Sequence, residues 1–197
     1  MTHLLRTTAA CLAALAFTAQ ANSVVNGGFE TGDLTGWTTF GDTSFDGVDT
    51  FSAQSGSYGA FFGSDGASGI SQAFATSAGS YTVTFMLSLQ DSATPNAFSW
   101  AWNGVTQAAA FTDATAFGYQ AFTAQVTASA GMSTLSFSFS NPQSFWLLDN
   151  VDVSPVPEPS SLLLLGGGLA VLLRRPRLQR QCSASGGGTT HECMRSS

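Results

Sequence analysis

The chain contains no lysine, and most of its length has no cationic side chain at all. Its six basic residues are arginines near the two ends, at positions 6, 174, 175, 177, 180 and 195. Residues 22–154 instead hold one glutamate and nine aspartates, a formal charge of −10. A segment without cations cannot neutralise phosphates, so we expect no nucleic-acid partner.

The same segment also lacks histidine and cysteine. All five residues of these types lie outside 22–154: His3, His191, Cys11, Cys182 and Cys193. Ser–His and Cys–His nucleophiles, Schiff-base chemistry and Cys/His zinc sites are therefore excluded there. A glycosidase needs two positioned carboxylates, but ten acids make some pair inevitable, and no cation or histidine could tune it. We expect a protein that is not an enzyme.

Residues 1–21 have the pattern of a secretion signal. Arg6 precedes an apolar run from Ala9 to Ala19, and Ala19-Gln20-Ala21 places small residues at the two positions that a signal peptidase reads. We expect an N-terminal signal helix and cleavage after Ala21, which places the remainder outside the cytoplasm. A short buried helix is the alternative.

Residues 155–177 combine three features in order. The sequence Val156-Pro157-Glu158-Pro159 is followed by an apolar Leu/Gly stretch and then by Arg174, Arg175 and Arg177. Because proline cannot continue a helix backwards, we expect a helix over about 160–173. Such a helix reaches about 21 Å, short for a bilayer core of about 30 Å, although arginine snorkelling reduces the gap. The arginines act as a membrane stop and favour a cytoplasmic C-terminus; a buried core helix is the alternative.

This ordered set resembles the PEP-CTERM sorting signal of Gram-negative bacteria. The resemblance implies export across the inner membrane, transient anchoring by the C-terminal helix, and processing by an exosortase, a membrane cysteine transpeptidase. The product would then reach the cell surface or the extracellular space. Chains of that family usually end soon after the arginines, whereas this one continues over 178–197, a Gly/Ser/Thr-rich tail that we expect to be disordered.

The segment 22–154 shows the period-two alternation of β-strands. Apolar residues alternate with small or polar ones over 81–89, 97–102 and 134–140, and Asn103-Gly104 predicts a hairpin turn into Val105. Further strands are expected near 24–29, 37–40, 57–62, 68–75, 117–127 and 145–153. About eight to ten short strands with one apolar face predict an all-β sandwich or barrel.

The order of local motifs narrows this architecture. Asn26-Gly27-Gly28-Phe29-Glu30 opens the segment, Tyr81-Thr82-Val83-Thr84-Phe85 lies in its middle, and Trp146 to Val151 closes it. This succession resembles the galactose-binding-like jelly rolls, which include many carbohydrate-binding modules. The resemblance implies a jelly-roll β-sandwich, and often a structural calcium ion held by an N-terminal carboxylate and a C-terminal aspartate. Glu30 and Asp149 match those positions, and their oxygens suit calcium; two exposed carboxylates or turn caps are the alternative.

Two further groups of residues admit more than one interpretation. Asp42, Asp46 and Asp49 lie within one loop that fails the EF-hand spacing, so we interpret them as turn formers. The four tryptophans could stack on sugars, but Trp100 and Trp102 alternate with small residues, which favours a buried core, and we expect the other two to be core residues as well. The four are Trp37, Trp100, Trp102 and Trp146.

Together these observations favour a non-catalytic exported protein of the cell surface or extracellular matrix. Its expected role is adhesive or structural, in exopolysaccharide or biofilm, because exosortase systems accompany exopolysaccharide production. A carbohydrate-binding module with a defined groove is the alternative, and the sequence assigns no glycan-binding residue. Binding of ice by a flat Ser/Thr/Ala face is disfavoured, because regular threonine repeats are absent.

Overall fold

The computed structural model describes residues 23–157, and their only regular secondary structure is the β-strand. No helix in this part of the chain is long and apolar enough to cross a membrane. The expected signal peptide, C-terminal helix and tail lie outside the described residues, as do Glu158, Pro159 and the arginines at 174, 175 and 177.

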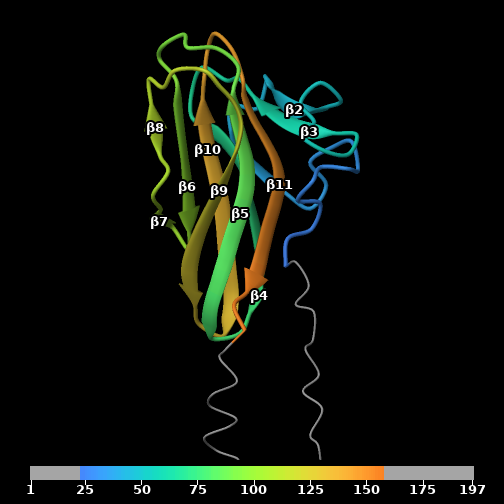
Figure 1. The fold of residues 1–197 in the computed structure, drawn as a ribbon, viewed down its shortest axis with the longest axis vertical. Helices are drawn as coiled ribbons and strands as arrows, with labels where there is room; N and C mark the ends of the chain where they lie inside the picture. Colours follow the sequence, from blue (N-terminus) through green and yellow to red (C-terminus); the bar gives the residue numbers. More distant parts are fainter. Residues whose placement is uncertain (1–22, 158–197) are drawn as a thin grey trace, which may run out of the picture. The chain divides into compact units, whose positions relative to one another are not determined.

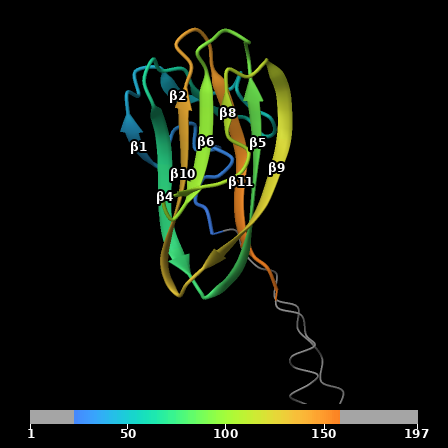
Figure 2. The same cartoon turned by 90° about the vertical axis from the view of Figure 1, so that its left-hand side faces the viewer.

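The strands form two antiparallel sheets. Sheet A has the order β1-β4-β10-β6-β7, with β8 also paired to β6, and sheet B has the order β2-β3-β11-β5-β9. The strands are β1 (Thr38–Gly41), β2 (Asp46–Asp49), β3 (Gly59–Phe62), β4 (Ser68–Thr76), β5 (Gly79–Leu89), β6 (Ala97–Trp102), β7 (Val105–Thr106), β8 (Phe111–Thr112), β9 (Phe117–Ala128), β10 (Gly131–Ser140) and β11 (Trp146–Pro155). Figures 1 and 2 show the sheets lying one over the other, which confirms the expected all-β jelly-roll sandwich.

The core lies between the two sheets because one side of each strand is apolar. Phe85 of β5 is at its centre. Its ring centroid is 5.1 Å from that of Phe137 and 5.6 Å from that of Trp100, both on sheet A. The period-two pattern in the sequence thus corresponds to alternate burial along β5, β6 and β10. Large aromatic side chains fill the space with few polar atoms.

The predicted strand over 24–29 is wrong. These residues form turns, because Asn26 and Phe29 adopt positive φ angles of 51° and 56°. The segment still lies against β11: Ser23 donates its N–H to the Val153 carbonyl at 2.9 Å, and the Gly27 carbonyl accepts the Val151 N–H at 2.9 Å. The N-terminal segment therefore reaches the last strand, as expected, without being a strand itself.

The hairpin at Asn103-Gly104 is confirmed. Both residues have positive φ angles, 51° and 78°, as a type I′ turn requires, and β6 pairs with β7 across the turn. β2 and β8 were not predicted. The first contains Asp46, Gly47 and Asp49, which are typical of turns, and the second has only two residues.

Candidate functional site

Asp149 is the buried member of the pair of carboxylates that was matched to a calcium site. It lies on β11 with no exposed surface. Its Oδ2 accepts the backbone N–H groups of Gln54 (2.8 Å) and Ser55 (3.1 Å), and its Oδ1 accepts that of Asn150 (2.7 Å). Burial raises the pKa of Asp149. The three N–H groups oppose this rise, and the negative charge of Glu30 adds to it.

Glu30 holds the C-terminal end of the loop between β2 and β3, the loop to which Gln54 and Ser55 belong. Its carboxylate accepts the N–H of Ser57 at 3.0 Å and of Tyr58 at 3.2 Å. Gly56 has a φ of 70°, and a Cβ there would lie 2.3 Å from Glu30 Oε1, so the turn needs glycine. The two carboxylates therefore hold the loop between β2 and β3 against β11. Within residues 23–157, no group of three or more Asp, Glu, His or Cys side chains is placed to hold a metal ion.

Of the three aspartates between 42 and 49, Asp42 and Asp49 accept hydrogen bonds from nearby residues, as expected of turn formers, whereas Asp46 does not. Asp42 accepts both the N–H and the hydroxyl of Ser44, which lowers the pKa of Asp42. Asp46 accepts from the Gly63 N–H and the Ser64 hydroxyl, while its burial raises its pKa. Asp46 thus links β2 to the segment that follows β3, and among the described residues these carboxylates form no group placed to hold a metal ion.

The four tryptophans belong to the core, and none is available for stacking on a sugar. Each is buried, and each indole N–H donates to a backbone carbonyl. The acceptors of Trp37, Trp100, Trp102 and Trp146 are the carbonyls of Asn26, Ala108, Thr127 and Ser140. The ring of each tryptophan packs in the core, and its N–H group is hydrogen-bonded within the fold.

The outer face of sheet A carries uncharged side chains, most of which are small. Since the inward positions of β4, β6 and β10 hold the core residues, the alternate positions face outward. Strand register places Thr38, Ser71, Ser136, Ala101 and Thr106 side by side across the sheet. The row beside it contains Phe40, Gly69, Ser138 and Ser99. The two rows differ, so the face does not carry a repeated array of one residue type.

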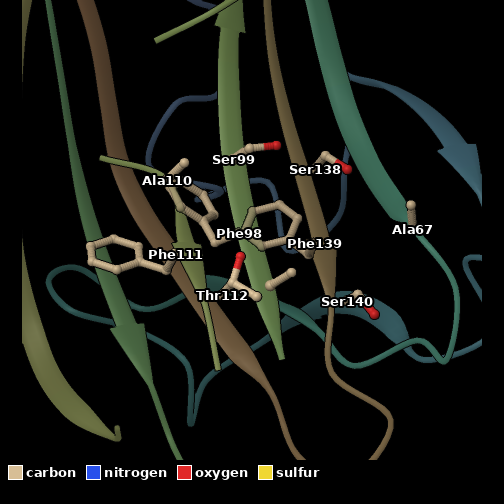
Figure 3. A pocket seen from close by; sticks show the side chains of 10 residues that line it. Ala67, Phe98, Ser99, Ala110, Phe111, Thr112, Ser138, Phe139 and Ser140 are labelled. Atoms are coloured by element: carbon tan, nitrogen blue, oxygen red, sulfur yellow. The ribbon is translucent and has the colours of Figure 1, made fainter. Parts of the chain in front are cut away.

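A groove of about 220 Å³ lies on this face, and we call it the sheet A groove. Serine and threonine hydroxyl groups, alanine methyl groups and three phenylalanines line it, and Figure 3 shows Ser99 and Ser138 side by side on neighbouring strands. Its lining contains no ionisable side chain. The lining residues are Ala67, Ala97, Phe98, Ser99, Ala110, Phe111, Thr112, Ser138, Phe139 and Ser140. The composition of this groove suits an uncharged ligand that has both hydroxyl and C–H surfaces.

Only the beginning of the expected sorting motif lies in the described residues. Pro155 ends β11, and Val156 donates its N–H to the Ser80 carbonyl at 2.8 Å. Pro157 is exposed and is the last described residue. The motif therefore starts directly at the end of the last strand.

Comparisons with known proteins agree with the sorting motif at residues 155–177 and with the β-sandwich fold. Residues 155–177 match the PEP-CTERM protein-sorting motif, which confirms the motif that was read from the sequence. Such a motif indicates export with transient anchoring through the C-terminus and processing by an exosortase. No curated protein matches the chain.

Solved structures of similar fold include carbohydrate-binding modules. One is a complex of TmCBM61 with β-1,4-galactotriose, with a TM-score of 0.57 and 19% identity over 69% of this chain and 99% of that one. A family 16 carbohydrate-binding module has a TM-score of 0.51 and 13% identity, over 67% and 99%. The CBM22-1 xylan-binding domain of Paenibacillus barcinonensis Xyn10C has a TM-score of 0.50 and 19% identity, over 72% and 100%. At these identities the likeness establishes the fold.

Proposed function

We propose that this chain is an exported, non-catalytic protein that binds uncharged polysaccharide through the sheet A groove. Its role is adhesive or structural in the extracellular matrix. The groove carries the proposal, because its hydroxyls can exchange hydrogen bonds with sugar hydroxyls while its methyl groups cover C–H surfaces. The sorting motif supports the location outside the cell. The modules of the same fold that bind galactotriose and xylan support the class of ligand.

Groove-filling substitutions test this function. In Ser99→Ile and Ser138→Ile, a hydroxyl is lost and the added branches occupy part of the groove, while β-branched residues suit a strand. We expect each variant of the full-length chain to bind neutral galactan, xylan or β-glucan at least about tenfold more weakly in affinity electrophoresis. Thr123→Ile, an exposed residue of β9 in sheet B, is the matched control. Equal retardation of all three variants and the unsubstituted chain would refute the assignment.

For the loop held by Glu30 and Asp149, we propose a structural calcium ion. Two carboxylates converge there, one of them fully buried, and the described residues include no lysine, arginine or histidine to balance them. Gly28 lies against both side chains: a Cβ there would be 3.8 Å from Glu30 Cγ and 3.9 Å from Asp149 Oδ1. Carboxylate and carbonyl oxygens are the ligands that calcium takes. The ion would neutralise the charge that burial makes costly.

A further inference from the structure

A second cavity, of about 260 Å³, lies over the β2, β3 and β11 side of sheet B, and we call it the phenylalanine pocket. It shares no residue with the sheet A groove. Figure 1 shows β2 and β3 beside β11, at the edge of the sandwich away from β6, β7 and β8. The lining residues are Asp49, Phe51, Ser52, Phe61, Gln90, Phe145 and Leu147.

Aromatic rings form the apolar part of this pocket. Phe61 and Phe145 meet edge to face, with their centroids 5.4 Å apart. Phe61 lies over Gly47, where a Cβ would come within 2.8 Å of the ring, so the position of Phe61 depends on that glycine. Phe51 is different, because it is 91% exposed. A ligand that covered the Phe51 ring would remove apolar surface from water.

Two polar groups sit beside these rings. Asp49 Oδ1 accepts the backbone N–H groups of Phe51 at 3.0 Å and Ser52 at 2.8 Å, which fixes the carboxylate in the lining of the same cavity as Phe51. Both of these hydrogen bonds from described residues are accepted by Asp49 Oδ1, so Asp49 Oδ2 is available to a ligand. Gln90 is held by its backbone N–H, which donates to the Phe145 carbonyl at 3.1 Å, while the residue remains exposed.

The electrostatic field at this pocket is negative. Tyr119, whose hydroxyl donates to the Ser52 carbonyl, has its pKa raised by burial and then by the carboxylates of Asp149 and Asp49. No lysine, arginine or histidine occurs among residues 23–157 to offset these charges. A cationic ligand is therefore attracted to the pocket, whereas a neutral one gains nothing from this field.

We propose that the phenylalanine pocket binds a hexosamine residue of a polysaccharide, with its amine free and protonated. The C–H face of the sugar ring covers Phe51 and Phe61, the ammonium group donates to Asp49 Oδ2, and a ring hydroxyl bonds the Gln90 amide. A cavity of this size takes a single sugar residue. Because the sheet A groove lies on the other sheet, one molecule would link two polysaccharide chains, which goes beyond binding neutral glycan at the groove.

Three oligosaccharides that differ at one position test the proposal. They are β-1,4-linked glucosamine, its N-acetylated form and β-1,4-linked glucose, each titrated calorimetrically into the full-length chain at about pH 6, where the amine is protonated. We expect the glucosamine oligomer to bind about tenfold more tightly than the other two, the size of one charge-assisted hydrogen bond. Asp49→Asn keeps Oδ1 for the turn and should abolish this preference. Phe51→Ala should weaken binding about fivefold through loss of the ring.

Matched variants separate a site from diffuse attraction. Asp65→Asn removes the same charge outside the pocket, and Phe45→Ala removes a ring that is 59% exposed outside it; both should bind like the unsubstituted chain. If Asp65→Asn lowers affinity as much as Asp49→Asn, or if the N-acetylated oligomer binds equally well, the proposal is wrong. Competition by an oligolysine of equal charge that also depends on Phe51 would instead indicate a peptide ligand and would overturn it. The same titrations on Ser99→Ile, which impairs the sheet A groove, separate the two sites: the preference for the glucosamine oligomer over the glucose oligomer should remain, and its loss would overturn the proposal.

Discussion

Calcium should raise the thermal stability of this protein through Glu30 and Asp149. Both carboxylates hold the loop between β2 and β3, and Asp149 is buried without a compensating cation among the described residues. An ion that binds only the folded state at a hundredfold excess over its Kd adds about 2.7 kcal/mol to the free energy of unfolding. For a domain of this size, the melting temperature should rise on the order of 10 °C.

Differential scanning calorimetry with calcium, magnesium or sodium at equal ionic strength measures this effect. Glu30→Gln and Asp149→Asn should abolish the calcium-dependent rise. Asp149→Asn should also cost about 1–3 kcal/mol by itself, because an amide cannot accept all three N–H groups that the carboxylate accepts. Asp91→Asn is the matched control, because Asp91 is an exposed turn residue whose side chain accepts the Ala93 N–H. The site does not exist if sodium reproduces the rise or if both variants keep it.

The pH dependence of stability gives an independent measure of the charge on Asp149. Because burial raises the pKa of Asp149 in the folded state, that state holds the proton at pH values where the unfolded chain has released it. This contribution to stability is complete below the unfolded value of about 3.9 and is lost as the pH rises through the raised pKa. A chelator removes any bound calcium from this measurement. Under that condition, the free energy of unfolding of the unsubstituted chain minus that of Asp149→Asn should decrease as the pH rises above about 4. A difference that does not change with pH would contradict this interpretation.

Two further predictions concern the core and the sorting motif. Phe85→Ala should lower the free energy of unfolding by about 3–5 kcal/mol in denaturant titrations, because it leaves a cavity in the core. The control Met86→Ala, on the outer face of β5, should cost about 1 kcal/mol or less. Similar losses in the two variants would show that Phe85 is not central to the core. Glu158→Ala should reduce the yield of processed protein in a host that has an exosortase, whereas Ser183→Ala should not, and equal yields would refute the role of the Pro-Glu-Pro sequence.

Strands with strict alternation could be predicted from the sequence, because burial of one face leaves a period-two pattern in the residues themselves. β5, β6 and β10 are of this kind. The segment 24–29 could not be placed correctly, because distant contacts determine its shape. The buried Gln72 side chain accepts the Val25 N–H at 2.7 Å and donates to the Val25 carbonyl at 3.0 Å, so a side chain supplies bonds that a neighbouring strand would otherwise make.

The candidate sites were predicted less completely, for a related reason. The resemblance placed Glu30 and Asp149 near each other, but the backbone N–H groups that they accept belong to a loop with no pattern in the sequence. The sheet A groove depends on the register that sets Ser138 opposite Ser99. The phenylalanine pocket depends on a β2–β3 pairing whose first strand resembles a turn in its residues. Register between strands is a property of the assembled sheets.

The place of β11 in sheet B determines when the domain can close. This strand lies between β3 and β5 and pairs with both, yet it is the last strand of the described residues. Until residues 146–155 are available, no strand lies between β3 and β5, and the core lacks Trp146 and Leu148. Closure of the sandwich therefore requires pairing between the latest part of the domain and strands made much earlier, which slows folding. Because the sorting motif begins where β11 ends, a chain moving out N-terminus first completes its fold only as that motif arrives at the membrane.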